Sequence, residues 1–130
     1  MELTTRYLLD TNAIIYLLNG HLATPLPKGQ YSVSIITEIE LLSFHALSDK
    51  EEQLITDLLQ QMDKISLTDE VSRKAINLRR SNKKLKLPDA VIAATAIIKN
   101  AILLTNDHIF SAVVGLNTQS LQLLDDSTQY

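Results

Sequence analysis

Short runs of β-forming apolar residues alternate along this chain with longer stretches of helical periodicity. The short runs predict strands at residues 7–9, 31–35, 64–67, 101–105 and 121–124. Apolar residues spaced three and four apart predict helices at residues 13–18, 35–46, 48–62, 68–80 and 88–99. Two prolines and a glycine predict a loop within residues 21–30. This order of elements is typical of an α/β domain with a mostly parallel sheet.

Capping signals indicate where the helices begin. Asn12 is a candidate cap for the first helix, and Ser48 with Glu51 forms the pattern of a capping box. Thr68 is a candidate cap followed by two acids, which the positive end of a helix dipole favours. Pro88 suits the first position of the last helix, whose body is apolar almost all round and is expected at the centre of the fold.

Two of the helices are expected to bury one apolar stripe each. The stripes consist of Ile35, Ile39, Leu42 and Ala46 in the first and of Leu54, Ile55, Leu58, Leu59 and Met62 in the second. The predicted helices 48–62 and 68–80 are expected to form a lobe beside the sheet. A further apolar set serves either as core or as a surface for a partner helix, namely Leu17, Leu18, Leu41, Phe44 and Leu47.

The composition is that of a globular domain, and 130 residues suit a single domain over 1–130. No cysteine is present, which excludes disulfides, a thiol nucleophile and Cys-ligated zinc. No apolar run is long enough for a membrane helix, and the first residues lack the pattern of a signal peptide. We therefore expect a cytoplasmic protein without a membrane partner.

Positive charge is concentrated in one segment, although the net charge of the chain is −3. Seven of the twelve Lys and Arg residues fall between Arg73 and Lys86, and no acid lies between Glu70 and Asp89. Such a segment on an acidic protein is compatible with contacts to nucleic-acid phosphates. The candidates for RNA contact are Arg79, Arg80, Lys83, Lys84 and Lys86. The alternative is a solvated helix end, where basic residues are favoured by the helix dipole.

Several acids are expected at the carboxyl ends of the strands, where parallel sheets bind ligands. Asp10 follows the first predicted strand, Asp107 follows the strand at 101–105, and Asp89 begins the apolar helix. Glu38 and Glu40 both lie near the start of the helix after the second strand, and periodicity does not choose between them. Clustered carboxylates repel one another unless a hard cation such as Mg²⁺ or Mn²⁺ binds them. Taken singly, each acid also fits a helix cap or a turn.

Four segments resemble PIN-domain proteins, and specifically the VapC-like toxin ribonucleases of bacterial toxin–antitoxin pairs. They are residues 8–12 (LLDTN), 34–42 (SIITEIELL), 87–96 (LPDAVIAATA) and 103–107 (LLTND). They occur in the family's order, and the resemblance spans residues 7–110. It implies a three-layer α/β/α fold with a central, mostly parallel sheet.

The resemblance also implies a metal-dependent endoribonuclease that uses Mg²⁺ or Mn²⁺. Its acidic cluster, catalytic and metal-binding, falls on Asp10, Glu40, Asp89 and Asp107, with Glu38 as a possible substitute for Glu40. Asn12 and Thr105 match polar positions beside the cluster that orient a water or a phosphate. The resemblance further implies a homodimer and a cognate antitoxin as partners. The alternative is a catalytically silent PIN-like module that binds RNA or a protein.

Overall fold

The computed structural model describes residues 4–124, which form five strands, five α-helices and one short 3-10 helix. The strands are β1 (Arg6–Leu9), β2 (Gln30–Ser34), β3 (Asp63–Ile65), β4 (Ile102–Leu104) and β5 (Thr118–Gln119). The helices are α1 (Thr11–Leu18), α2 (Ile35–Leu42), α3 (Asp49–Gln60), α4 (Asp69–Ser81), α5 (Leu87–Ile98) and the 3-10 helix η1 (His108–Ala112). The predicted α/β fold class is confirmed.

The five strands form one sheet in the order β3-β2-β1-β4-β5, and every neighbouring pair is parallel. On the central strand, Leu8 pairs with Ser32 of β2 on one side and with Leu103 of β4 on the other. The chain builds outward from β1 through β2 to β3 and then crosses back to β4 and β5. The strand order therefore reverses between β1 and β4.

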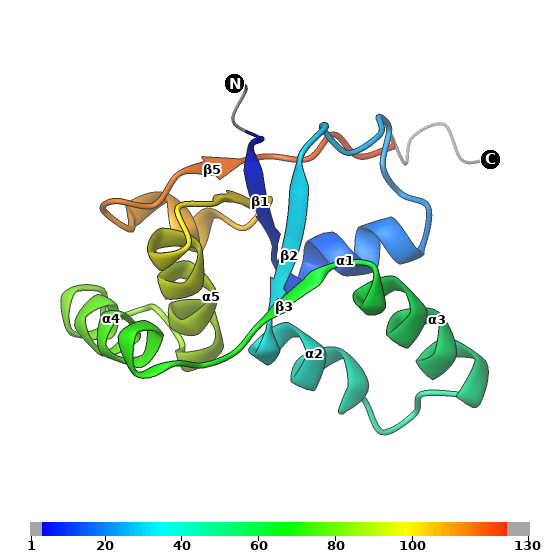
Figure 1. Ribbon diagram of the computed structural model, residues 1–130, viewed down its shortest axis with the longest axis horizontal. Helices are drawn as coiled ribbons and strands as arrows, with labels where there is room; N and C mark the ends of the chain where they lie inside the picture. The colour runs from blue at the N-terminus through cyan, green and yellow to red at the C-terminus, as the bar shows by residue number, and fades with distance from the viewer. Residues whose placement is uncertain (1–3, 125–130) are drawn as a thin grey trace.

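Alternation along the strands places apolar side chains on both faces of the sheet, as expected for a buried parallel sheet. Leu8 and Leu103 enter one core cluster with residues of α4 and α5. Tyr7, Leu9 and Leu104 enter a second cluster with residues of α1, α2 and α3. Figure 1 shows the two sets of helices on opposite sides of the strands. The three-layer α/β/α arrangement is thus confirmed.

Helix α5 is buried almost all round, as its sequence predicts. Seven consecutive residues, 90–96, are buried, because one side of the helix meets the sheet and another meets α4. The single polar residue among them, Thr95, donates its hydroxyl hydrogen to the Val91 carbonyl within the helix. Since no polar group is left without a partner there, the helix is compatible with a central position.

Two predicted helix starts are corrected by the structure, and two are confirmed. Asp10, not Asn12, caps α1, because its carboxylate oxygen Oδ1 accepts from the Ala13 amide at 2.7 Å. Asn12 lies inside the first turn of α1 and is exposed. Pro88 is the second residue of α5, and Leu87 is the first. The capping box of α3 and the Thr68 cap of α4 are present as predicted.

The two predicted apolar stripes are only partly buried. Helix α2 ends at Leu42, so Ala46 lies outside it, and Ile39 is 53% exposed. Thr37 and Leu41 form the buried face of α2 instead. On α3, Ile55 and Leu59 are buried, Leu54 is exposed and Met62 lies beyond the helix. Periodicity finds an apolar stripe, but the angle at which the helix meets the sheet decides which edge of the stripe is covered.

The structure also corrects two further predictions, the position of the last strand and the lobe expected from helices 48–62 and 68–80. The predicted strand 121–124 is wrong, because β5 lies at Thr118–Gln119 and Leu123 makes only an isolated antiparallel bridge with Leu22. Both residues of β5 are polar and exposed, so no hydrophobic pattern marks this edge strand. Helices α3 and α4 do not form one lobe, because they pack into different clusters on opposite faces of the sheet.

The remaining candidate partner residues are divided between core and surface. Leu41 is buried, Leu17, Leu18 and Leu47 are half-buried, and Phe44 is exposed. Most of this set therefore belongs to the edge of the second core. Within residues 4–124, no helix is both long and apolar enough to span a bilayer.

Replacing Gly29 with alanine is expected to destabilise the protein. A Cβ atom at Gly29 would lie 2.5 Å from the Thr5 carbonyl oxygen and 2.7 Å from the Tyr7 ring. Because backbone and a packed ring cannot both yield, we expect a loss of about 1–3 kcal/mol in the free energy of unfolding. Urea titration monitored by circular dichroism measures this loss. The exposed Thr24→Ala in the same loop is the control, and an unchanged midpoint for Gly29→Ala would contradict the packing described.

Candidate functional site

The candidate site lies where the strand order reverses, at the carboxyl ends of β1 and β4. Asp10 directly follows β1, and its amide donates to the Leu104 carbonyl of β4 at 3.3 Å. Thr105 directly follows β4, and Asp107 lies two residues further on. In open parallel sheets the helices diverge at such a switch point, which leaves a crevice for a ligand. The topology therefore brings residues nearly 100 positions apart to one place.

Asp10 is the buried centre of the site, with 4% of its surface exposed. One carboxylate oxygen accepts from the Ala13 amide, and the other accepts from the Thr105 hydroxyl. Burial raises the pKa of Asp10 above its usual value, although these two hydrogen bonds lower it. Repulsion from Asp107 and Glu40 raises the pKa further. The carboxylate is thus firmly oriented but electrostatically unfavourable when charged.

Thr105 joins Asp10 to Asp107 through a single buried hydroxyl. This oxygen accepts from the Asp107 amide at 3.0 Å while its hydrogen is donated to Asp10. Asp107 itself is exposed and caps η1, since its Oδ1 accepts from the Ile109 amide at 3.0 Å. The hydroxyl of Thr105 is therefore used within the protein to position two acids.

Asp89 completes the group from the first turn of α5. It is half-buried, and burial is the main cause of its raised pKa. Repulsion from Asp107, Glu40 and Asp10 raises the pKa of Asp89 further, while Lys86 lowers it. All four acids that the sequence singled out thus lie within electrostatic reach of one another.

Glu40, rather than Glu38, is directed to this group. The Glu40 oxygen Oε1 accepts from the Thr11 hydroxyl at 2.7 Å, whereas Glu38 forms a 3.0 Å salt bridge with Lys64. The Thr11 and Thr37 hydroxyl oxygens are 3.2 Å apart, and Thr37 is fully buried. Because Thr11 donates to Glu40, Thr37 is the donor to Thr11.

Sequence reasoning missed the two threonines that hold Glu40. Thr11 adjoins Asp10, and Thr37 lies three residues before Glu40, yet neither position shows a pattern of its own. The available signal was the presence of a hydroxyl beside each acid. Only the contact between α1 and α2 joins the two threonines.

The chemistry of the donors fits Mg²⁺ or Mn²⁺. Within residues 4–124, no three acidic or histidine side chains are close enough to hold one ion as they stand. The donors are carboxylate oxygens, which hard divalent cations prefer. Burial is the main cause of the raised pKa of Asp10 and of Asp89, and repulsion from the other acids raises both further, so positive charge placed between the acids would be stabilising. A bound cation would be held by Asp10, Asp89 and Asp107, with Glu40.

The predicted basic residues are separated into two places. Lys83 and Lys84 are exposed in the loop between α4 and α5, and they line a hollow of about 250 Å³ with His108. Arg79 and Arg80 line a different, apolar groove between α4 and α5. The Arg79 Nε donates to the Leu85 carbonyl at 3.3 Å, which orients that side chain along the helix end.

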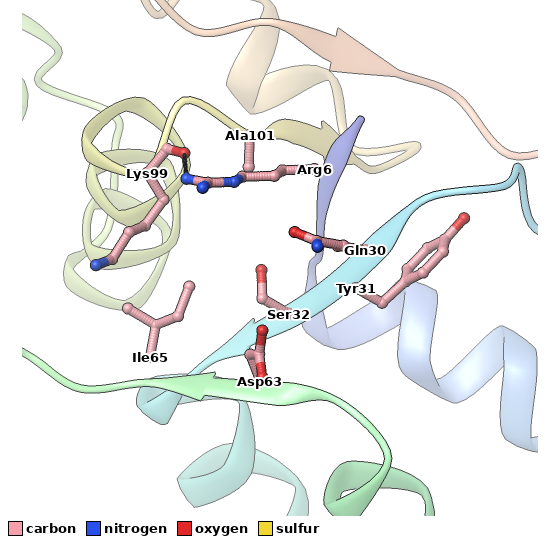
Figure 2. Close-up of a pocket in the computed structure, with 8 residues that line it drawn as sticks. All are labelled: Arg6, Gln30, Tyr31, Ser32, Asp63, Ile65, Lys99 and Ala101. Carbon is pink, nitrogen blue, oxygen red and sulfur yellow. Dashed lines mark hydrogen bonds between the residues drawn. The ribbon is translucent and has the colours of Figure 1, made fainter. Parts of the chain in front are cut away.

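A further cavity, of about 260 Å³, lies at the amino ends of the strands, on the side of the sheet away from the acids. Figure 2 shows Gln30, Ser32 and Asp63 around it, with Arg6 reaching the Lys99 carbonyl. These residues belong to the beginnings of β1, β2 and β3 and to the end of α5. The cavity mixes basic and acidic groups and shares no residue with the acidic site.

Comparisons with known proteins agree with this architecture. The family model described as PIN domain matches residues 7–116. A solved toxin–antitoxin complex from Klebsiella pneumoniae is 30% identical, with a TM-score of 0.70 over 85% of this chain and 94% of the other. VapBC-1 from nontypeable Haemophilus influenzae is 26% identical, with a TM-score of 0.71 over 89% and 98%.

A more distant structure has the same fold. VapBC2 from Rickettsia felis, bound to a DNA fragment from their promoter, is 24% identical, with a TM-score of 0.74 over 91% of this chain and 100% of the other. A search of the curated proteins finds no match.

Replacing Asp89 with asparagine is expected to stabilise the protein in chelator as pH rises. A pKa raised by folding means that stability is greatest below the ordinary Asp value, about 3.9, and is lost as pH rises through the raised pKa. Asparagine carries no charge, so the melting temperature of Asp89→Asn should exceed that of the parent increasingly between about pH 4 and 7, a range of about three units above the ordinary carboxyl value. Melting curves in EDTA measure this difference. Asp57→Asn on the exposed face of α3 is the control; a constant difference for Asp89→Asn would contradict the repulsion described.

Proposed function

Since the chain belongs to the PIN domain family, we propose that it is a metal-dependent endoribonuclease and the toxin of a toxin–antitoxin pair. The observation that carries this proposal is the convergence of four acids from four segments, Asp10, Glu40, Asp89 and Asp107, at the switch point of the sheet. A structural role does not account for it, because clustering like charges costs stability. A site for cations and phosphate does.

Hydrolysis of a phosphodiester needs a water in line with the leaving oxygen and relief of negative charge. Bound Mg²⁺ or Mn²⁺ would supply both, by acidifying water and stabilising the leaving oxygen. Asp10 would be the ligand with the best defined orientation, because two hydrogen bonds hold its carboxylate. Glu40 and Asp107 are exposed, and each of their carboxylates accepts one hydrogen bond, from the Thr11 hydroxyl and from the Ile109 amide.

The polar residues beside the acids divide into positioning and substrate-facing groups. Thr105 positions Asp10 and Asp107, since its hydroxyl is fully used between them. Asn12 is exposed in the first turn of α1, two residues after Asp10, which leaves its amide available to a phosphate or a water. Lys83 and Lys84 are exposed in the loop before Asp89 and would bind the RNA backbone, with Arg79 and Arg80 extending this contact along α4.

The partners that we propose are RNA, a cognate antitoxin and a second copy of the chain. The likeness to the Klebsiella pneumoniae toxin–antitoxin complex supports the antitoxin. The second candidate function is a silent PIN-like module that binds without cutting. It is favoured by the absence, within the described residues, of a preformed group of three ligands.

Metal-dependent cleavage is the first test. The antitoxin-free protein should cut transfer or ribosomal RNA with Mg²⁺ or Mn²⁺ and not with EDTA. Asp10→Asn should lower the rate about 100-fold or more, the scale on which loss of a charge-stabilising group acts. Asp57→Asn is the control for a neutralised acid outside the site. Cutting that survives Asp10→Asn would indicate a contaminating nuclease.

Cation binding separates a selective nuclease from a silent module when no RNA is cut. A cation that binds only the folded protein stabilises it by about 2.7 kcal/mol at 100 times its dissociation constant. We therefore expect Mn²⁺ to raise the melting temperature of the parent and to have a smaller effect on Asp89→Asn. If Mn²⁺ shifts neither protein, the acids bind no cation and the silent module is favoured.

The salt dependence of RNA binding tests the lysine loop. Each phosphate contact to single-stranded RNA contributes about 0.7 to the slope of log affinity against log salt. The double reversal Lys83→Glu with Lys84→Glu should reduce this slope by at least about 1.4. Lys50→Glu, exposed at the start of α3, is the control. An unchanged slope would remove these lysines from the RNA-binding surface.

A further inference from the structure

The lining of one hollow continues along the chain to two of the acids, although none of the four acids is itself part of that lining. It has a volume of about 250 Å³ and lies between the loop that follows α4 and the helix η1. Its apolar part is formed by Leu85, Ile109 and Ala112, and its polar part includes Lys83, Lys84 and His108. We name it the His108 hollow.

The two walls of the His108 hollow are connected to Asp107 and to Asp89. Asp107 immediately precedes His108, and its carboxylate accepts from the amide of Ile109, which lines the hollow. On the other side, the loop that carries Lys83 and Lys84 continues within a few residues to Asp89. Leu85, at 2% exposure, anchors this loop in the core. Both walls therefore lead from the hollow to a residue of the acidic site.

From this arrangement we propose that the His108 hollow binds the base of one nucleotide next to the scissile phosphate of single-stranded RNA. This inference rests on the proposed nuclease function and assigns a subsite that the acids do not provide. Ile109 and Ala112 contact the face of the base, and the buried Leu85 lies behind them. The ammonium groups of Lys83 and Lys84 bind the adjoining phosphate.

The apolar and positively charged parts of the hollow match the apolar base and the negatively charged phosphate of an RNA strand. A nucleotide presents an apolar base face and a charged phosphate on opposite sides of its sugar, and the hollow offers an apolar floor beside two ammonium groups. Its volume lies below the 300–1,000 Å³ typical of sites for drug-sized ligands, so one base fits and several do not. A simple anion would gain nothing from the apolar floor.

The substrate must be single-stranded at this point. Bases in a double helix are stacked and paired, and the deep groove of A-form RNA does not admit side chains to their edges. Only an unpaired base can leave the strand and enter a hollow. His108 is exposed at its rim, where an imidazole can stack on the base or hydrogen-bond its edge. His108 is therefore the residue that sets the preference for the base.

Filling the hollow is the direct test. Ala112 is exposed and lines the hollow, so Ala112→Phe places a ring where the base would lie without disturbing the core. Val114, 87% exposed and two residues further on, is not part of the lining, and Val114→Phe is the matched control. Both changes are made in the Asp10→Asn background, so that binding is measured without cleavage.

Fluorescence anisotropy with a labelled single-stranded RNA of random sequence gives the affinities. We expect Ala112→Phe to weaken binding at least fivefold and Val114→Phe to leave it within twofold, the loss being on the scale of one stacked base. Double-stranded RNA of the same length should bind weakly and equally to both variants. Equal affinity of Ala112→Phe and Val114→Phe for the single strand, or an Asp10→Asn parent that binds no RNA, would overturn the proposal.

Base preference tests His108. In an active protein, mapping the cuts in a random single-stranded library should show a preferred nucleotide beside the cut, and His108→Ala should flatten this preference while His108→Gln retains part of it. An unchanged preference in His108→Ala would overturn the role of this residue. Loss of binding on filling the hollow, in a protein that neither cuts RNA nor is stabilised by Mn²⁺, would refute the nuclease and keep the nucleotide site.

Discussion

The buried carboxylate of Asp10 is the constraint on which the site depends. A charged group removed from water costs several kcal/mol unless it is paired, and hydrogen bonds to a charge return about 1.5–3 kcal/mol each. The Ala13 amide and the Thr105 hydroxyl provide two such bonds, but Asp107 and Glu40 add repulsion. The protein therefore places a carboxyl group that is unfavourable when charged at the carboxyl end of its central strand, as expected where binding of a ligand offsets that cost.

The topology of the sheet explains why the four acids, whose repulsion is unfavourable, lie together at one point. The strand order reverses between β1 and β4, so the segments that follow these two strands diverge to opposite faces and leave their ends uncovered. Helix α5 starts at the same edge and contributes Asp89 from its first turn, while α2 contributes Glu40. Each acid lies in or next to an element that has residues buried in one of the two cores. Rigid cores thus hold four repelling groups together.

The basic residues lie in two separate places, and this separation indicates the direction in which an RNA strand would cross the site. Lys83 and Lys84 lie beside η1 and the His108 hollow, whereas Arg79 and Arg80 border the groove between α4 and α5. A strand that entered the hollow with one base would pass the lysines before its phosphate reached the acids. Phosphate binding and base recognition would then be separate from the acids, so that each can be changed by mutation without altering the others.

The sequence by itself determined the order of the elements, the capping of α3 and α4 and the burial of α5, because these depend on residues within a few positions of one another. It also indicated the four acids, whose positions after strands and at helix starts are local. Only the tertiary structure distinguished Glu40 from Glu38, joined Thr11 to Thr37 and placed α3 and α4 on opposite faces. These outcomes depend on contacts between segments 26 to 95 residues apart, such as Thr11 with Thr37 and Thr105 with Asp10. No local pattern carries such contacts, because they arise only when the crossovers of the sheet bring the segments together.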